Sequence, residues 1–465
     1  MGVWEMIFDK SHYSLTVGVP LRLTYRDDIM LVSDNKNVLT NNGMIYAPID
    51  KLRPEGQARI IAVDSSGNEL DTCDVTIVTW KANSLELVAK EINRFNQYFE
   101  IDGVLYGYDS NVLYKSIDGF ETREIVGYSN FTPGNYPFLQ TPYGYFARSG
   151  GNGEVYQSQD LLHWDLCFAD CIRGLYHSFD YHFDEQTGLL YIYLGEYSAD
   201  AGTNDRRHSV YRGVIDAQNN QTWDKAIEFY SVNEFNADPN NHPSARHVHV
   251  VTVDKYTGNV WVNVGDGPDQ CHHLVSRDNG DTWTIVGSGL GQSSGYSQNW
   301  RSLSIWFTQD YVYWNMDTGA RQAINRLHRS KVPTTDTIVN EHMERVQMLD
   351  NGSHWYHCKA VDDYGNEYII MGQSAEGEHR DWRTRLFAIR EIQGGEVEIQ
   401  ELISAPSDDP SILQAMVQFE PRMQDSDGNI YANGRLTDFG AVRCRFTRKY
   451  RPKKYTWALP KVFVN

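Results

Sequence analysis

A hairpin of one kind recurs seven times along this chain, and this recurrence constrains the fold more than any other feature. Each copy has an apolar strand, a turn rich in Asp, Asn or Gly, and a second strand rich in aromatic residues. Asp, Asn and Gly supply the backbone conformations that tight hairpin turns require. The copies are YFEIDGVLYGY (98–108), FLQTPYGYFAR (138–148), YHFDEQTGLLYIYLG (181–195), VVTVDKYTGNVWVNVG (250–265), IWFTQDYVYWNM (305–316), KAVDDYGNEYIIMG (359–372) and RMQDSDGNIYANG (422–434).

A third strand follows each hairpin, and a fourth usually follows that one. The third strands are NVLYKS, GEVYQS, HSVYRG, HHLVSR, AINRLHR, TRLFAIR and AVRCRF. Four strands per unit, repeated at intervals of roughly 40 to 70 residues, are typical of a β-propeller. A β-sandwich would not repeat a four-strand unit seven times, and a β-helix repeat would be much shorter. The sequence therefore predicts an all-β protein built on a seven-bladed propeller.

The turn between the third and fourth strands of one unit carries a recognisable motif. SRDNGDTW (276–283) fits S-x-D-x-G-x-T-W, and degenerate copies start at Ser116 and Ser158. Ser and Asp side chains in such a turn can bind its own backbone amides. The motif resembles the Asp-box (BNR) repeats of the sialidase-like propellers. That resemblance implies a fold, and it implies very little about chemistry.

Residues 1–80 do not match the repeat. SLTVGVPLRLTY and ARIIAVDSSGNELDTCDVTIVTW read as alternating strands, which predicts an N-terminal immunoglobulin-like β-sandwich. Residues 81–95 are then expected to be a linker, and residues 96–465 the propeller. The seventh unit lacks a clear fourth strand, so either the linker or residues 455–464 could close the ring.

Composition excludes some classes of partner and leaves others open. The 465 residues carry a formal net charge of −19, which argues against nucleic acid because phosphates demand a basic surface. No apolar run is long enough to cross a membrane as a helix, and residues 1–15 lack the pattern of a signal peptide. The 12 Trp and 29 Tyr suit a protein that stacks aromatic rings on sugars. We expect a polysaccharide or oligosaccharide substrate and an extracellular, cell-surface or phage-borne location, and the sequence does not indicate the oligomeric state.

Polar residues gather where the first strand of each blade begins. These starts rim one face of a propeller, so their side chains converge on one depression. The clearest example is Arg246-His247-Val248-His249, which opens the first strand of blade four; His247 and His249 should face one side of it. Such a rim predicts a ligand site.

Arginine, histidine and tyrosine together suit β-elimination on a uronic acid. A cation must neutralise the carboxylate, a base must remove the neighbouring proton, and an acid must protonate the leaving oxygen. The arrangement resembles the propeller-type polysaccharide lyases, such as the ulvan lyases and rhamnose-glucuronate lyases. The resemblance implies His177 as base, Tyr230 as acid and Arg246 as carboxylate ligand, with His247 as a further catalytic candidate. The residues expected to bind substrate are Trp300, Arg301, Tyr356, Glu420 and Arg422.

A metal ion is not needed for this chemistry, but a structural Zn²⁺ or Ca²⁺ is compatible with the sequence. Some lyases of the resembled class hold a structural zinc through His and Cys. The residues of this chain that would suit such a site are His249, Cys271, His273 and Cys358. The alternative is that these are buried thiols and hydrogen-bonded imidazoles, since no C-x-x-C pair is present.

Two other functions compete with the lyase. A sialidase-type hydrolase needs three arginines around a carboxylate and a tyrosine nucleophile activated by glutamate. The arginines could come from Arg94, Arg246, Arg301 and Arg422, with Tyr356 and Glu420 beside them. The F/Y-R-I-P segment of that family is absent, because the first blade reads NRFN (93–96). The same aromatic and cationic rim would also suit a carbohydrate- or receptor-binding propeller without catalysis.

Overall fold

The fold is described from a computed structural model of the chain. The structure describes residues 12–16, 21–22, 30–34, 39–41, 44–46, 56–78, 83–91, 97–134, 137–149, 153–175, 177–197, 203–292, 298–317, 323–348, 354–361, 366–373, 383–391, 395–406, 416–419, 424–426, 428–435 and 441–450. No helix among these residues is long and apolar enough to cross a membrane.

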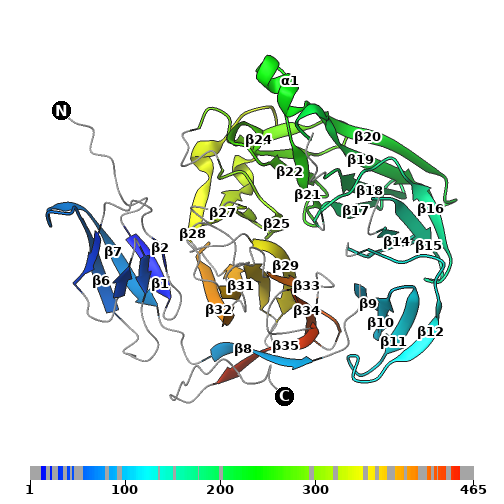
Figure 1. Ribbon diagram of the computed structural model, residues 1–465, viewed down its shortest axis with the longest axis horizontal. Helices are drawn as coiled ribbons and strands as arrows, with labels where there is room; N and C mark the ends of the chain where they lie inside the picture. The colour runs from blue at the N-terminus through cyan, green and yellow to red at the C-terminus, as the bar shows by residue number, and fades with distance from the viewer. Residues whose placement is uncertain are drawn as a thin grey trace.

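Seven four-stranded antiparallel sheets stand in a ring, which is the architecture of a seven-bladed β-propeller (Figure 1). Blade one consists of β9 (Gln97–Ile101), β10 (Val104–Asp109), β11 (Val112–Ser116) and β12 (Glu124–Tyr128). Blade two consists of β13 (Leu139–Thr141), β14 (Gly144–Arg148), β15 (Val155–Ser158) and β16 (Trp164–Phe168). Blade three consists of β17 (Phe179–Asp184), β18 (Leu189–Gly195), β19 (His208–Ile215) and β20 (Gln221–Phe229). Blade four consists of β21 (His247–Val253), β22 (Val260–Gly265), β23 (His272–Ser276) and β24 (Thr284–Ser288). Blade five consists of β25 (Ser304–Phe307), β26 (Tyr311–Asn315), β27 (Ala323–His328) and β28 (Glu344–Met348). Blade six consists of β29 (His354–Val361), β30 (Glu367–Gln373), β31 (Arg383–Glu391) and β32 (Val397–Pro406). Blade seven consists of β33 (Met416–Phe419), β34 (Asn429–Arg435), β35 (Ala441–Tyr450) and β8 (Asn83–Glu91).

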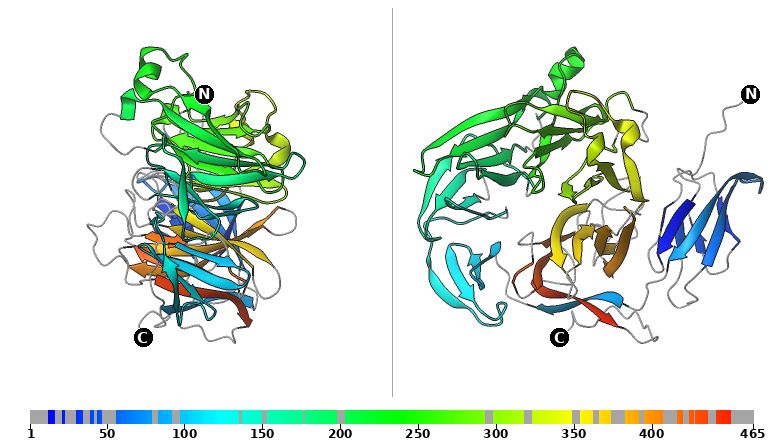
Figure 2. Two further views of the ribbon diagram at one scale, coloured as in Figure 1. Left: turned by 90° about the vertical axis from the view of Figure 1, so that its right-hand side faces the viewer. Right: turned by 180° about the vertical axis from the view of Figure 1, so that it is seen from behind.

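The first strand of each blade is the innermost. Strands β17, β21, β25, β29 and β33 contact one another in this order around the centre. Six of the seven hairpins predicted from the sequence form the first two strands of a blade; the seventh, at 422–434, contains β34, whereas β33 lies before it at Met416–Phe419. The short helix α1 (Val232–Ala237) projects from the edge of the ring between blades three and four, as Figure 2 shows from two further directions. Single 3₁₀ turns are η2 (Thr203–Asp205), η3 (Pro268–Gln270), η4 (Arg329–Lys331) and η5 (Asn340–His342).

The fourth strand of blade seven comes from the N-terminal side of the chain. Strand β8 pairs with β35 along its whole length, from Asn83 opposite Tyr450 to Glu91 opposite Val442. The expected linker at residues 81–95 is thus corrected: most of it is a propeller strand, because β35 would otherwise be an unpaired edge. Across the join, the Ser426 amide donates to Glu100 at 2.7 Å, so blade seven also meets blade one.

Residues before β8 form two further sheets. Their orders are β1-β7-β6-β3 and β2-β5-β4, where β1 is parallel to β7. The strands are β1 (His12–Thr16), β2 (Leu21–Arg22), β3 (Met30–Ser33), β4 (Leu39–Asn41), β5 (Met44–Tyr46), β6 (Gly56–Val63) and β7 (Glu69–Val78). They lie beside the ring, where β2 contacts β28 (Figure 1).

The buried apolar residues lie mainly between neighbouring blades. Trp261, Trp300 and Trp314 form part of the core between blades four and five, and each is at most 2% exposed. Phe120 and Tyr431 close the core between blades one and seven, with their rings 6.2 Å apart. Each such side chain contributes roughly 1.5–3 kcal/mol on burial, so the blades stabilise one another around the ring.

The S-x-D-x-G-x-T-W turn and its two degenerate copies have the hydrogen bonds expected from the sequence. Ser276 accepts from the Gly280 amide at 2.8 Å, and Asp278 accepts from the Thr282 amide at 2.9 Å. The indole of Trp283 donates to the Gly280 carbonyl at 3.1 Å, which fastens the turn to the fourth strand. The turns are therefore held by their own side chains and lie away from the centre of the ring.

Candidate functional site

A carboxylate sits at the centre of the polar rim of blades three to five. Asp266 directly follows β22, and it receives two imidazoles from β21 and one guanidinium from the segment before β25. His247 Nε2 lies 2.9 Å from Oδ2, His249 Nε2 lies 3.2 Å from Oδ1, and an Arg301 terminal nitrogen lies 3.0 Å from Oδ1. Burial alone would raise the pKa of Asp266, but the hydrogen bonds and charge of the two histidines outweigh burial and hold this pKa below its usual range.

Strand pairing explains why both imidazoles reach the same carboxylate. His247 is paired with Gly265, and the register shifts between Val248 and Val250, so the chain bulges at this point. The packing around Gly265 is close: a Cβ atom there would lie 3.1 Å from His249 Cε1 and 3.2 Å from Arg301 Cγ, so these side chains would have to shift slightly to admit one. The sequence prediction that His247 and His249 face one side of the strand agrees with this geometry.

Arg301 joins two acidic residues of neighbouring blades. The same terminal nitrogen that approaches Asp266 lies 2.9 Å from Asp317 Oδ2, and Asp317 lies two residues after the end of β26, the second strand of blade five. Arg246 stands farther off, 3.6 Å from Asp266, and 41% of its side chain is exposed. Of the two guanidiniums, Arg246 is therefore the one more open to a ligand.

Tyr197 belongs to the same rim and was not among the residues predicted from the sequence. Its ring centroid lies 4.1 Å from that of His247, and its amide donates to the Arg173 carbonyl at 2.6 Å. Burial raises the pKa of the Tyr197 phenol, and the nearby carboxylate of Asp266 raises it further. The preceding Glu196 is buried and accepts from the Ser209 amide at 2.8 Å, which fixes the chain just before the tyrosine.

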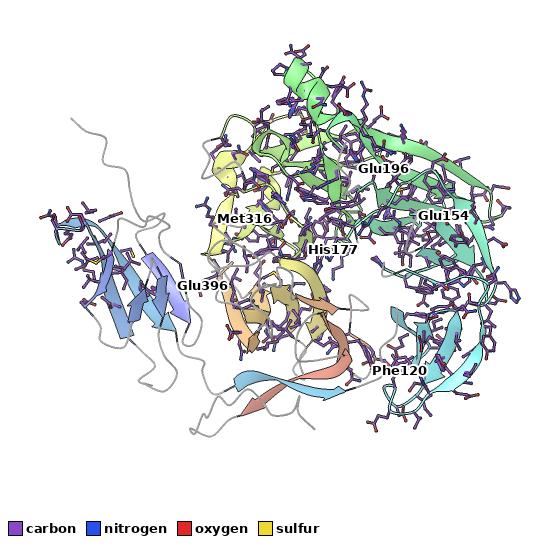
Figure 3. The ribbon with its side chains drawn as sticks, viewed as in Figure 1. Phe120, Glu154, His177, Glu196, Met316 and Glu396 are labelled. Atoms are coloured by element: carbon purple, nitrogen blue, oxygen red, sulfur yellow. The ribbon has the colours of Figure 1, made fainter. Side chains whose placement is uncertain are left out.

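His177 lies at the inner end of blade three, where Figure 3 shows it facing the centre of the ring. It is 3% exposed, and its ring stacks on that of His357 from blade six with centroids 5.9 Å apart. The next residue, Ser178, accepts from the Gly195 amide at 3.0 Å, two residues before Tyr197. His177 and Tyr197 therefore come from adjacent chain segments on one rim.

Tyr230, the acid predicted from the sequence, is not placed with His177. It follows β20, the outermost strand of blade three, whereas His177 precedes β17, the innermost strand, so strands β18 and β19 lie between them in the sheet. The guanidinium of Arg207 lies over the Tyr230 ring at 4.9 Å, and Arg207 is itself bound to Glu234 at 2.7 Å. The backbone of Tyr230 pairs with that of Ser244, near the start of blade four.

Trp300 does not have the exposed surface that binding a sugar would need. It is 1% exposed, stacks on Trp314 with ring centroids 4.7 Å apart, and covers Gly287. The prediction that Trp300 binds substrate is therefore corrected: this indole belongs to the core. Of the other predicted binding residues, Glu420, Arg422 and the side chain of Tyr356 lie outside the described part of the molecule.

The four metal ligands predicted from the sequence are not gathered into one site. Cys271 is buried, and its thiol lies 3.1 Å from the Gly267 carbonyl, which it can donate to; His273 packs against Trp300 and Trp314. Burial raises the pKa of the Cys271 thiol and lowers that of His273 to about 3. Cys358 lies two blades farther on, in β29. Within the described ranges, one group of three candidate ligands has atoms within 4.8 Å of one another: His247, His249 and Asp266.

Comparison with known proteins adds no family. No protein-family model matches the sequence, and no curated protein matches it significantly. Among solved structures, an auxiliary nutrient binding protein from Bacteroides thetaiotaomicron is similar, with 9% identity, a TM-score of 0.38, and 93% of this chain and 95% of that one covered. YCF48 from Cyanidioschyzon merolae has 12% identity and a TM-score of 0.40, covering 78% of this chain and 98% of that one.

A third similar structure is an extracellular domain described as part of a hybrid two-component system from B. thetaiotaomicron. It has 10% identity and a TM-score of 0.42, and it covers 81% of this chain; the chain spans only 40% of that structure. Likenesses this distant carry no argument about function. The propeller rests on the strand pairing of the chain itself.

Proposed function

We propose that the rim of blades three to five binds an acidic saccharide and cleaves it by β-elimination next to a uronic acid. The observation that carries the proposal is the meeting of three kinds of side chain at one rim: Arg246 and Arg301 around Asp266, the Tyr197 phenol against His247, and His177 on the segment beside Tyr197. Elimination needs a cation, a base and an acid, and these are the groups that supply them.

Each group has a role that follows from its surroundings. Arg246, the most open cation, would bind the uronate carboxylate, and Arg301 would assist from below. Neutralising the carboxylate acidifies the C5–H bond, so a neutral imidazole such as His177 can take that proton. The electron pair then forms the C4–C5 double bond and expels the C4 oxygen. Tyr197 would donate its proton to that oxygen, and its raised pKa keeps the proton in place beforehand.

Saccharide binding without cleavage is a second candidate function, and one specific observation favours it. Arg301 is already paired with two carboxylates, Asp266 and Asp317, and His177 is almost fully buried. A rim whose charges are largely balanced suits binding of a saccharide without cleavage. A sialidase-type hydrolase has less support, because the F/Y-R-I-P segment of that family is absent from this sequence.

The test is absorbance near 235 nm while the protein is incubated with a panel of uronic-acid polysaccharides, including ulvan-like, glucuronan-like and capsular types. Only elimination creates the absorbing unsaturated uronate. We expect the absorbance to rise, and we expect the rise to disappear in His177→Ala and in Tyr197→Phe. Tyr230→Phe is the matched control and should keep the signal.

Other outcomes separate the alternatives. Reducing sugar or free sialic acid appearing without absorbance would replace the lyase with a hydrolase. Binding to the polysaccharide without either product would support the non-catalytic reading. Loss of the signal in Tyr230→Phe with retention in Tyr197→Phe would restore the acid predicted from the sequence.

We also propose that residues 1–80 form an immunoglobulin-like module and that the protein acts outside the cell or at a cell or phage surface. The module is supported by the two sheets that precede β8. The location is supported by the substrate class, since acidic polysaccharides are extracellular polymers. Expression of residues 1–82 alone should give a cooperatively unfolding domain, and an unfolded product would contradict the module.

A further inference from the structure

The group of His247, His249 and Asp266 has the geometry of a metal centre. Two imidazoles two residues apart on one strand and a carboxylate directly after the paired strand offer three ligand atoms within 4.8 Å of one another. Two atoms bound to one tetrahedral zinc ion at about 2.0–2.1 Å stand about 3.3–3.4 Å apart. The nitrogen–oxygen separations in the structure, 2.9 Å for His247 and 3.2 Å for His249, are within about half an ångström of this spacing.

The three side chains are buried to different degrees, and the cluster is open on the side of the carboxylate. The His247 and His249 side chains are 4% and 1% exposed, whereas 23% of the Asp266 side chain is exposed. The protein thus surrounds the two nitrogen ligands and leaves access past the carboxylate, toward the rim. A site with three protein ligands and one open position is the arrangement of catalytic rather than structural zinc.

The neighbours of Asp266 fix its carboxylate in place. Arg301 holds one carboxylate oxygen at 3.0 Å and is itself held by Asp317 at 2.9 Å. With Arg246 at 3.6 Å, the two carboxylates and two guanidiniums carry no net charge when both imidazoles are neutral. A divalent ion would therefore make the cluster positive.

We propose that His247, His249 and Asp266 bind one divalent transition-metal ion, of the Zn²⁺ class, with an open coordination position facing the rim. Two nitrogens and one carboxylate oxygen are a donor set that zinc and its first-row neighbours accept. This ligand set differs from the Cys- and His-containing set predicted from the sequence, with which it shares only His249. If the proposed function is also correct, the ion would give an acidic chain a local positive charge where the uronate binds.

The experiment measures metal directly on the full chain. The protein is treated with a chelator, dialysed, titrated with Co²⁺ and followed by absorbance between about 500 and 650 nm, where tetrahedral Co²⁺ absorbs; Zn²⁺ binding is then measured by calorimetry. We expect one ion per chain, and binding weakened at least ~100-fold in His249→Ala and in Asp266→Asn. The matched control is His163→Ala, which removes an exposed imidazole 2.7 Å from Asp160 and should bind metal as the unmodified chain does.

Several results would overturn the proposal. It fails if the unmodified chain binds neither ion, or if His249→Ala and Asp266→Asn bind as tightly as the unmodified chain. To exclude misfolding, each variant is checked by circular dichroism, and Asp266→Asn preserves the shape of the side chain. The unmodified chain should also gain thermal stability with Zn²⁺, whereas Asp266→Asn should not. No substrate is used, so failure of the metal site and failure of the lyase remain distinguishable.

Discussion

The phenol ring of Tyr197 lies 4.1 Å from the imidazole of His247, although the two residues belong to different blades. Tyr197 follows the second strand of blade three, and His247 begins the first strand of blade four. The rim is therefore built from two kinds of position, the starts of innermost strands and the ends of their neighbours. Antiparallel pairing brings both kinds to the same edge of each blade.

Replacing Tyr197 by Phe should show whether Tyr197 donates a proton or only packs against His247. The ring and its contact with His247 remain, while the hydroxyl that would protonate the leaving oxygen is lost. We expect kcat for elimination to fall about 10²- to 10⁴-fold with KM nearly unchanged. Initial rates at 235 nm measure both parameters. Unchanged kcat in Tyr197→Phe would remove Tyr197 from the chemistry.

Replacing Arg246 by Gln should weaken substrate binding more than stability. Its side chain is 41% exposed and stands 3.6 Å from Asp266, so its loss leaves no buried partner unpaired at close range. We expect KM for a uronic-acid oligosaccharide to rise roughly 10- to 100-fold, as when a hydrogen bond to a charged group is lost. Arg207→Gln is the control, because Arg207 is similarly exposed but pairs with Glu228 and Glu234 beyond the rim. Equal KM changes in the two variants would indicate a nonspecific charge effect.

The sequence predicted the architecture well because hairpin patterns are local. Strand alternation and turn residues occur within a dozen positions, and six of the seven hairpins were found from them, with the first strand of the seventh misplaced. The ring closure was left open, because the pairing of β8 with β35 joins segments more than 300 residues apart in the chain. No local pattern in residues 83–91 says which strand they pair with.

The site was predicted in part, for a related reason. Reading the starts of first strands found His177, Arg246, His247 and Arg301, all of which lie on the rim. It missed Tyr197, Asp266 and Asp317, which lie one or two residues after the ends of second strands. Listing second-strand ends as well would have found them. Trp300 was misassigned because burial depends on packing between blades, which a residue type alone does not reveal.

Replacing Gly287 by Ala should destabilise the core between blades four and five. A Cβ atom at this position would lie 2.2 Å from the Trp300 ring, which is itself held between strands and cannot withdraw freely. We expect a loss of about 1–3 kcal/mol or more in the free energy of unfolding, measured by urea denaturation. The control is Gly127→Ala in β12, where the added Cβ meets only the end of the Leu162 side chain at 2.9 Å. If both variants were equally stable, the tight packing of Trp300 on Gly287 would be contradicted.

Truncation should show that the propeller begins at β8 rather than at residue 96. A chain starting at residue 83 keeps the pairing of β8 with β35, whereas a chain starting at residue 96 leaves β35 as an exposed edge. We expect the shorter chain to aggregate or to unfold at a lower temperature, and the longer one to unfold cooperatively. Size-exclusion chromatography and thermal unfolding followed by circular dichroism measure the difference. Equal behaviour of the two chains would contradict ring closure by β8.

Acid should destabilise the protein partly through His272. Burial lowers the pKa of this imidazole to about 3, and the neighbouring His242 lowers it further; their rings are 4.6 Å apart. The unfolded chain binds a proton at this position below about pH 6.5, while the folded chain stays neutral until about pH 3. This contribution to the free energy of unfolding is thus fully present above pH 6.5 and is lost as the pH falls toward 3, by about 2–3 kcal/mol at pH 4.5.

His272→Leu should be destabilised at pH 7, because the contact of His272 with Ser288 at 2.9 Å is lost. The variant should nevertheless lose less stability than the unmodified chain between pH 7 and pH 4.5. Urea denaturation at both pH values measures this, with His182→Leu, at a partly exposed imidazole in β17, as the control. Identical pH dependence in His272→Leu and the unmodified chain would show that another buried group carries the acid sensitivity.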